Sequence, residues 1–470
     1  MVDGANGRAG AVETEPDETE PTQRHLVEFA GGGTGTGELT WAQRGLWRLI
    51  QRIGSYLPIG ARMPLPPGFT VAEAIADLRF VMASYPTART RLQFGGADPV
   101  QVVHPSGAVE LEIVDAADDA DPAALAKQVQ LRFWHAEHDF VADWPVRMAL
   151  IRHRGVLTHR IWVMCHLVTD GNGAVTILRE MAARDCSRSA AARSALAQAV
   201  WQASAAGQRQ SRASMRHWEK VLTALPASSA PRSEDPPSPR YWQALSNSPA
   251  TYLAIRLIAA RTGVEPTTVL LGLYALALAR VTGLNPLPLQ VTVSNRFRPG
   301  MADCVAPIMQ DGLGTIDIAD ETVDSLIRRC RQRVMVAYKH AYYDPDHRTE
   351  LLDRLANDRG EPVEVGFFFN DRRLKQRQDD SPLPTAQQVE RAREQTSLRW
   401  THKGDHHPFD PLYVYVDDEP GTIQLTLLND THWLAPERTE AVVRGLEEIA
   451  VTAALDPNTR TGLSSVGTAR

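Results

Sequence analysis

The sequence predicts an α/β (or α+β) fold in which helices cover mixed sheets and the chain divides into two lobes. Its 470 residues exceed what one hydrophobic core usually supports. Helical and strand periodicities mix in both halves without a repeated βαβ period. A segment from Pro226 to Pro239 holds five prolines and divides the chain almost evenly.

These features predict five segments along the chain. The first 37 residues are acidic and Gly-rich and offer few apolar groups to offset the entropy of ordering, so we expect a disordered tail. The predicted boundaries are a tail at 1–37, a first lobe at 38–225, a linker at 226–240, a second lobe at 241–457 and a frayed tail at 458–470.

In the first half, one helix is expected to begin near Thr40, which can serve as its N-cap. Further helices are expected at 70–84, at 123–135 and over parts of 197–225. Strands are expected at the end of 85–94 and at 100–103, 109–114, 146–151 and 161–164.

The second half opens with helices at 250–262 and 266–282, which end at Gly263 and Gly283. Further helices are expected at 323–339 and 436–454. Strands are expected at 289–293, 314–318 and 363–369, with a hairpin of 412–416 and 422–428 and a loop over 374–399.

Composition excludes several classes of protein. A net charge of −6 gives no reason to expect nucleic acid or an anionic membrane as a partner, and no apolar run approaches the roughly 20 residues that span a bilayer. The N-terminus lacks the apolar core of a secretion signal. The four cysteines include no CxxC pair, which argues against a disulfide framework or zinc site and predicts a cytoplasmic protein.

The stretch from Trp162 to Gly173, WVMCHLVTDGNG, holds the best candidate for chemistry. An apolar run predicts a buried strand, and Asp170 to Gly173 predicts a tight turn before a helix from Ala174. His166 would then lie where the strand leaves the core, within reach of a substrate, with the Asp170 carboxylate nearby. The alternative is a core histidine beside an ordinary turn.

Two other clusters predict no site. His406 and His407 with Asp410 mimic a metal cluster, but adjacent side chains on an extended chain diverge and a third ligand is lacking. The run from Gly31 to Gly37 lacks the Lys-Ser/Thr pair of a phosphate loop, so we expect flexible chain there.

An ordered set of motifs resembles the condensation domains of nonribosomal peptide synthetases, from about residue 38 to 455. Cys165 to Gly171 is similar to the family's HHxxxDG motif, with Cys165 in place of the first His. The other matching segments are Trp41–Trp47 (AQ-x-x-LW), Tyr85–Thr90 (HxxLRT), Phe140–Arg147 (F-D-x-x-x-P-x-R), Gly263–Gly283 (a long helix), Ser294–Arg296 (S-G-R) and Phe368–Asn370 (F-N).

The resemblance implies two lobes like chloramphenicol acetyltransferase, arranged as a V-shaped pseudo-dimer with a central tunnel. It implies an acyl or aminoacyl thioester on the phosphopantetheine arm of an acyl or peptidyl carrier protein, no permanently bound cofactor, and a small amine or alcohol as acceptor. We expect a free-standing monomer, because the chain has no room for an adenylation module. A CoA-dependent acyltransferase of the same superfamily and a non-catalytic recruitment module remain alternatives.

The resemblance also implies roles for single residues. His166 would be the general base or would position the nucleophile. Asp170 would organise the loop by pairing with an arginine, for which Arg89 is the candidate. Chain alternation would make Cys165 a buried packing residue that points away from the face of His166.

Four more residues complete the predicted site. Gly171 would supply a backbone conformation or a close approach that a side chain would block. Asn370 would bond the oxyanion or the substrate amide, unless it caps its own turn. Arg296 and Ser294 would line the tunnel, with a surface salt bridge as the alternative for Arg296. The turn at 306–311 departs from the family pattern, which puts the donor side in question.

Overall fold

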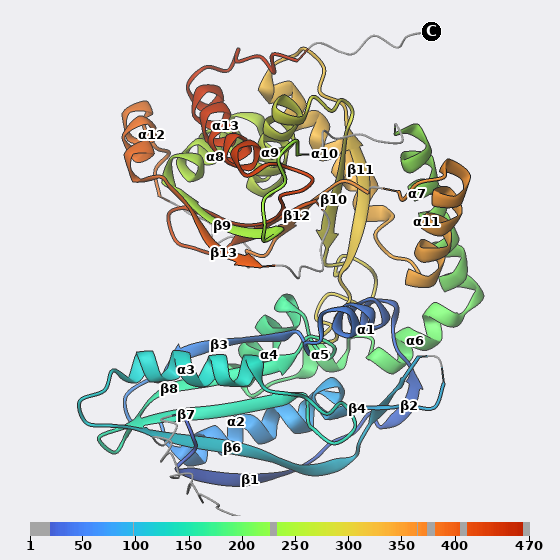
Figure 1. The fold of residues 1–470 in the computed structure, drawn as a ribbon. Helices are drawn as coiled ribbons and strands as arrows, with labels where there is room; N and C mark the ends of the chain where they lie inside the picture. The colour runs from blue at the N-terminus through green and yellow to red at the C-terminus, as the bar shows by residue number, and fades with distance from the viewer. Residues whose placement is uncertain are drawn as a thin grey trace, which may run out of the picture.

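The computed structural model describes residues 19–96, 98–225, 233–363, 365–373, 381–404 and 411–463. Figure 1 shows two lobes, one built mainly from the N-terminal half and the other from the C-terminal half. Each lobe has a mixed sheet with helices packed on it, so the predicted α/β class is confirmed. The V-shaped pseudo-dimer and its tunnel stay predictions.

The first lobe is organised on a five-stranded sheet in the order β1-β6-β7-β8-β3. Its strands are β1 (Gln23–Ala30), β3 (Pro58–Pro64), β6 (Ser106–Ala116), β7 (Val146–His153) and β8 (Val156–Cys165). Strands β6 and β7 run parallel and the other neighbours run antiparallel. A smaller sheet joins β2 (Gly35–Glu38), β5 (Val100–Val103) and β4 (Thr90–Gln93).

Helices cover both faces of the five-stranded sheet because its strands are apolar on both sides. On one face α1 (Trp41–Ile53) and α3 (Pro122–His135) pack against Val163 and Cys165 of β8. On the other face α2 (Val71–Ser84) and α4 (Gly171–Ala183) pack against Trp162 and Met164. The remaining short elements here are η1 (Pro86–Arg89), α5 (Ser187–Ala190) and α6 (Ala195–Ala203).

The second lobe has a seven-stranded sheet in the order β11-β10-β12-β14-β15-β9-β13. Its strands are β9 (Tyr241–Ser248), β10 (Leu287–Val293), β11 (Gln310–Ile316), β12 (Phe367–Asp371), β13 (Ser397–Gly404), β14 (Leu412–Asp417) and β15 (Ile423–Asp430). The largest core lies where α8 (Pro249–Thr262), α9 (Pro266–Thr282), α10 (Val323–Lys339) and α13 (Pro436–Leu455) cover one face. The remaining helices of this lobe are α7 (Ala205–Ala224), α11 (Pro345–Arg359), α12 (Ala386–Ala392) and η2 (Arg393–Gln395).

The two sheets share one arrangement of four strands. In the first lobe a parallel pair, β6 and β7, leads into the β7–β8 hairpin, and β8 then pairs antiparallel with the earlier β3. In the second lobe β12 and β14 are parallel, β14 and β15 are antiparallel, and β15 pairs with the earlier β9. The helix that follows is α4 in one lobe and α13 in the other. This repetition supports the expected internal pseudo-dimer.

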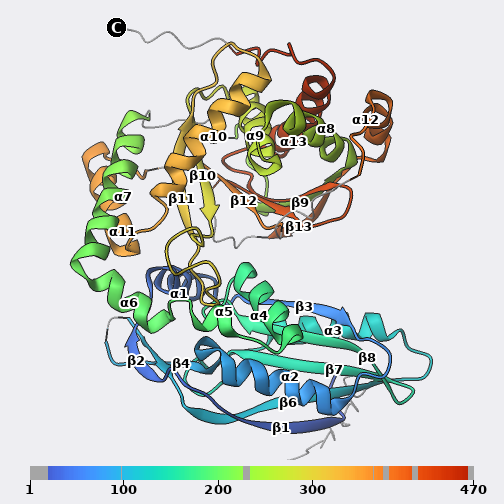
Figure 2. The ribbon, with the colours of Figure 1, turned by 180° about the vertical axis from the view of Figure 1, so that it is seen from behind.

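Helix α1 of the first lobe contacts the second lobe near the start of α11. The Arg44 guanidinium lies 3.0 Å from Asp344 and 2.7 Å from Asp346, and Arg48 also binds Asp346. The rings of Trp41 and Tyr342 pack edge to face with centroids 5.1 Å apart. The lobes are therefore held together on the side where Figures 1 and 2 place α1, α6, α7 and α11.

The predicted disordered tail is wrong for residues 19–37, and residues 1–18 lie outside the described part. Strand β1 pairs along its length with β6 and buries Val27 and Phe29. These two apolar residues stand among polar ones, so the strand signal in the sequence is weak here. The glycine run packs as well: a Cβ at Gly31 would lie 2.3 Å from the Ala83 carbonyl oxygen. Small residues are needed there because two backbones meet.

Two other predicted boundaries are wrong. Helix α7, assigned to the first lobe, buries Trp218 and Leu222 against α11 and β11 of the second. The predicted frayed tail is ordered through residue 463: Thr461 is fully buried and its N–H donates to the Glu321 carbonyl at 2.9 Å. Residues 464–470 and the first part of the predicted linker, 226–232, lie outside the described residues.

The long helices and the 412–428 hairpin agree with prediction. Sequence reasoning missed β1, β3, β9, β13, α11 and α12, which are short, polar or at sheet edges. Within the described residues, no single helix has the length and apolar composition of a membrane span; α8 and α9 meet that standard only as a pair bent by 110°.

Candidate functional site

His166 lies immediately after β8, at the point where the strand leaves the core. Its backbone N–H donates to the Leu57 carbonyl at 3.0 Å, which ties the residue to the chain that enters β3. Leu57 has a φ of 52°, an uncommon left-handed conformation for a bulky residue. The side chain of His166 is half-buried, and its Nδ1 is enclosed without a hydrogen-bond partner among the described residues.

Cys165 is the last residue of β8 and is buried, as predicted. Its thiol lies in the core beneath α1 and α3 and donates to the Tyr56 carbonyl at 3.2 Å. Burial raises the pKa of this thiol to about 12, so it stays protonated. Cys165 therefore supports the peptide that carries His166 and supplies no nucleophile.

Asp170 caps helix α4 rather than entering a turn. Its Oδ1 accepts from the Gly173 N–H at 2.9 Å, and its backbone is extended, as an N-cap requires. The helix consequently begins at Gly171, three residues earlier than predicted. The prediction of a turn was wrong because the Asp side chain satisfies the first free N–H groups of the helix.

The partner of the Asp170 carboxylate is Arg296 from the second lobe. The two guanidinium nitrogens lie 2.7 and 2.9 Å from the two carboxylate oxygens, and both side chains are almost fully buried. The predicted partner Arg89 is wrong: its guanidinium binds the carbonyls of His104 and Gly32 inside the first lobe. The alternative of a surface salt bridge for Arg296 is wrong as well.

The segment 294–310 connects β10 to β11 and lies against the His166 loop. The Thr169 hydroxyl donates to the Val305 carbonyl at 3.0 Å, and the Ile308 N–H donates to Asp170 at 3.3 Å. Arg296 also donates to the Cys304 carbonyl at 2.7 Å. The unusual turn at 306–311 is thus buried against the first lobe at Ala306 and Ile308, which explains its small and apolar residues.

The close approach predicted at Gly171 occurs at Gly173 instead. A Cβ at Gly173 would lie 2.3 Å from the Val305 carbonyl oxygen and 2.5 Å from the Thr169 hydroxyl. A Cβ at Gly171 would meet nothing within 4 Å, so this position opens on free space at the N-terminus of α4. Both glycines stand in the motif region of the sequence, but only the packing of the second-lobe segment against Gly173 distinguishes them.

Asn370 and Ser294 lie on the second-lobe sheet, half-buried at the ends of β12 and β10. The Asn370 side chain hydrogen-bonds the Tyr413 hydroxyl on the neighbouring strand. In the described part of the chain, no hydrogen bond joins Asn370 or Ser294 to His166. The structure therefore joins Arg296 to Asp170 in the loop that carries His166, and it shows no hydrogen bond that would link Asn370 or Ser294 to His166 among the described residues.

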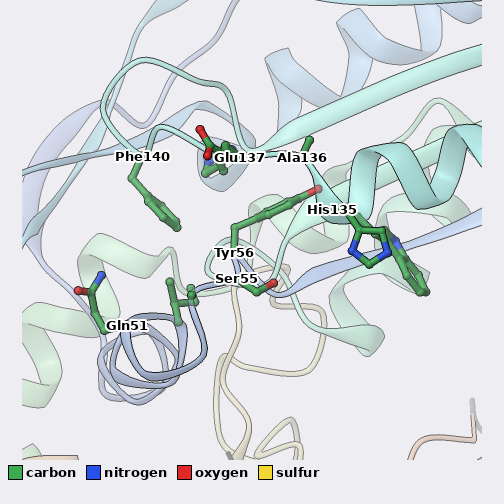
Figure 3. Close-up of a pocket in the computed structure, with 11 residues that line it drawn as sticks. Gln51, Ser55, Tyr56, His135, Ala136, Glu137 and Phe140 are labelled. Carbon is green, nitrogen blue, oxygen red and sulfur yellow. The ribbon is translucent and has the colours of Figure 1, made fainter. Parts of the chain in front are cut away.

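A hollow of about 540 Å³ opens between the ends of α1 and α3 (Figure 3). Tyr56 lies at its wall, with its ring stacked on His138 at 5.1 Å and its hydroxyl bonded to the Phe133 carbonyl at 2.5 Å. The Tyr56 carbonyl accepts a hydrogen bond from Cys165, which links this wall of the hollow to the residue before His166. Sequence reasoning missed Tyr56 and Leu57, which carry no motif signal.

No group of three or more potential metal ligands occurs in the ranges that the structure describes. The cluster of His406, His407 and Asp410 lies outside those ranges.

These features define an α/β protein whose two related lobes are joined at an His-x-x-x-Asp-Gly loop. The chain belongs to the condensation domain family, since residues 38–405 match the family described as "Condensation domain". The resemblance found in the sequence is confirmed.

Three relatives illustrate the similarity. The chain is 24% identical over 378 residues to the PF 1022-synthetase of Rosellinia sp., a match that covers 72% of this chain and 11% of that protein. It is similar in fold to the condensation domain of the Monacolin K polyketide synthase MokA (TM-score 0.71, 16% identity, 92% of this chain and 100% of that one). It is also similar to the X-domain from teicoplanin biosynthesis (TM-score 0.64, 18% identity, 90% and 96%). The chain thus spans about a tenth of the curated relative it matches.

Proposed function

We propose that this chain forms an amide or ester bond in natural-product biosynthesis by transferring an acyl or aminoacyl group from a carrier protein to an amine or alcohol. The nucleophile attacks the thioester carbonyl carbon, the C–S bond breaks, and the thiol leaves on the phosphopantetheine arm. Membership of the condensation domain family supports an acyl-transfer role. The observation that carries the proposal is the loop of His166, held by the buried Asp170–Arg296 pair.

We propose one of the two roles expected for His166. Its Nδ1 is enclosed without a hydrogen-bond partner among the described residues, so Nε2 is the ring nitrogen that can meet a substrate. A neutral ring with its proton on Nε2 donates a hydrogen bond there, and His166 then positions the reacting groups or stabilises developing negative charge on oxygen.

The test measures product by intact mass from a set of carrier-bound acyl thioesters and the matching CoA thioesters. His166→Ala should lower the rate at least about 100-fold, the usual contribution of such a group. His432→Ala, in the corresponding loop of the second lobe, is the control and should retain the wild-type rate. An undiminished rate in His166→Ala, with the fold confirmed by circular dichroism, would rule out the catalytic proposal.

A second substitution separates the two roles. His166→Gln keeps an N–H donor but cannot act as a base near neutral pH. If His166 acts as a donor, His166→Gln should retain more activity than His166→Ala. Equal losses in the two variants would instead assign the role of general base.

Two alternatives are decided by the same assay. Use of CoA thioesters with carrier-bound donors ignored would identify a CoA-dependent acyltransferase. A non-catalytic recruitment module is favoured by the fold likeness to the X-domain and by Cys165 in place of the first motif His. Two observations argue against a recruitment module. His166 is only half-buried, and a Cβ at Gly171 in the same motif would meet open space. The free-standing organisation, the monomeric state and the cytoplasmic location stay predictions.

A further inference from the structure

Four exposed cationic side chains lie in a row along α7, the helix labelled beside α11 in Figure 2. Arg209, Arg212, Arg216 and Lys220 follow the spacing i, i+3, i+7 and i+11, which places them on one face of the helix. The row is about 16 Å long at 1.5 Å per residue. We call it the α7 basic row.

The charges of the α7 basic row are not balanced within the lobe. None of the four side chains forms an ion pair with any residue that the structure describes. The neighbouring acid, Glu219, lies to one side of the row and is held by Arg354 at 2.9 Å. Like charges three and four residues apart repel one another, so the helix is less stable with this row than without it. An anionic partner would remove the repulsion.

The cationic surface continues onto the end of α10. The ring of His340, which follows α10, stacks on His217 of α7 with centroids 4.5 Å apart and planes 14° apart. Arg298 donates to the Lys339 carbonyl at 3.0 Å, which brings two more cations to the same place. Burial, followed by the charges of His217, Lys339, Arg298 and Arg216, lowers the pKa of His340 to about 4, so this ring is neutral at pH 7.

Two exposed apolar side chains lie beside these cations. Met335 is 62% exposed and Val336 is 42% exposed. Met335 lies four residues before the cation Lys339, and Val336 lies four residues before His340, so each shares a helical face with the residue that it precedes. An apolar patch with charges around it is typical of a surface that binds another protein.

We propose that the α7 basic row and the end of α10 dock an acidic helical segment of a partner protein. The inference goes beyond the proposed function and does not depend on it. The net charge of −6 gives the whole chain no general affinity for nucleic acid. A membrane surface is disfavoured because the apolar face of α7, including Met215 and Trp218, is packed against α11 and is unavailable to lipid.

The test uses a fluorescent helical peptide with glutamates at i, i+3, i+7 and i+11 and leucines beside them. Binding to the full chain is measured by anisotropy at low and high salt. The variant Arg209→Glu/Arg212→Glu/Arg216→Glu should weaken binding about tenfold or more, as expected for the loss of three exposed charge pairs. The salt dependence should fall with it.

The matched control reverses three exposed arginines elsewhere in the second lobe: Arg391→Glu, Arg399→Glu and Arg438→Glu. Each triple variant changes the net charge by three times −2, from −6 to −12. The control should leave binding within about twofold. Arg209→Gln/Arg212→Gln/Arg216→Gln gives a milder second variant, which should weaken binding in the same direction.

Three results would overturn the proposal. Equal weakening by the two charge-reversed triples would show an effect of bulk charge. Equal binding of a peptide with the same glutamates scattered around the helix would show that the row is not recognised. Tighter binding to phosphatidylserine vesicles or to a DNA duplex than to the peptide would assign the surface to lipid or nucleic acid.

Discussion

The loop that joins β8 to α4 and the loop that joins β15 to α13 occupy the same place in the two lobes. At each place one arginine binds both carboxylate oxygens of an aspartate: Arg296 binds Asp170 in the first loop, and Arg240 binds Asp430, the last residue of β15 before the second loop. The Arg296 side chain is 11% exposed and comes from the other lobe, whereas Arg240 is 46% exposed and comes from its own. The first pair therefore joins the lobes, and the second holds one lobe only.

The histidines of the two loops also differ, in whether the ring itself is held by a hydrogen bond. The Nε2 of His432 is hydrogen-bonded to the Pro237 carbonyl at 3.2 Å, so this ring is fixed at a structural corner. His166 is held through its backbone, by the Leu57 carbonyl, which leaves its ring for other partners. The loop after β15 thus has a structural role in the second lobe, whereas the loop after β8 carries the candidate site in the first.

The largest expected difference between the loops is in stability. Arg296→Ala leaves the Asp170 carboxylate buried and unpaired, so we expect the free energy of unfolding to fall by about 3–5 kcal/mol. Arg240→Ala removes a half-exposed partner, so a loss of about 1 kcal/mol or less is expected. Urea unfolding followed by circular dichroism measures both values. Similar losses in the two variants would contradict the distinction between the loops.

The sequence predicted this fold well where periodicity is long and apolar. Helix 323–339 and the core of β8 have many buried residues at regular spacing, so local pattern and tertiary packing agree. Strand β1 and helix α12 were missed because their burial depends on partners far along the chain. Neither has enough local apolar content to predict it.

The site was predicted in part. His166 and Asp170 stand in one short motif, and the structure places them as neighbours in the loop. The arginine partner was assigned wrongly because Arg89 lies in a matching segment of the same lobe, while Arg296 is 126 residues away from Asp170 in the chain. Only the fold of the 294–310 segment brings that guanidinium to the carboxylate, and no spacing rule within the motif contains this information.

The two glycines of the first loop should respond differently to a methyl group. Gly173→Ala forces Cβ against the Val305 carbonyl, so we expect a loss of about 2–3 kcal/mol in unfolding free energy. Gly171→Ala meets open space in the first turn of α4 and should be neutral or stabilising by up to about 1 kcal/mol. Thermal unfolding measures both. A destabilised Gly171→Ala with a stable Gly173→Ala would reverse the assignment of the close approach.

The first lobe should also be sensitive to acid through His138, whose ring stacks on Tyr56. Burial, followed by the Arg147 charge, lowers the pKa of this ring to about 4, below the ordinary value near 6.5. The unfolded chain therefore takes up the proton first as pH falls. Stability from the neutral ring is complete above pH 6.5 and is lost as pH falls toward 4.

We expect that loss to be about 2 kcal/mol. His138→Phe keeps a ring against Tyr56 but cannot titrate, so its stability should change less over the same range. Urea unfolding at pH 7, 5.5 and 4 for both proteins gives the comparison. Parallel pH profiles would show that another group causes the acid sensitivity.

The smallest effect is expected at Cys165, which supports the first loop from beneath. Cys165→Ser keeps a donor toward the Tyr56 carbonyl, but its shorter bond and smaller oxygen leave the apolar pocket less well filled. We expect a loss of about 1 kcal/mol in unfolding free energy and a change in the His166-dependent rate of no more than about threefold. Cys304→Ser, at a buried thiol in the 294–310 segment, is the matched control. A loss of activity confined to Cys165→Ser, at unchanged stability, would show that the thiol sets the orientation of the His166 ring rather than only filling the core beneath it.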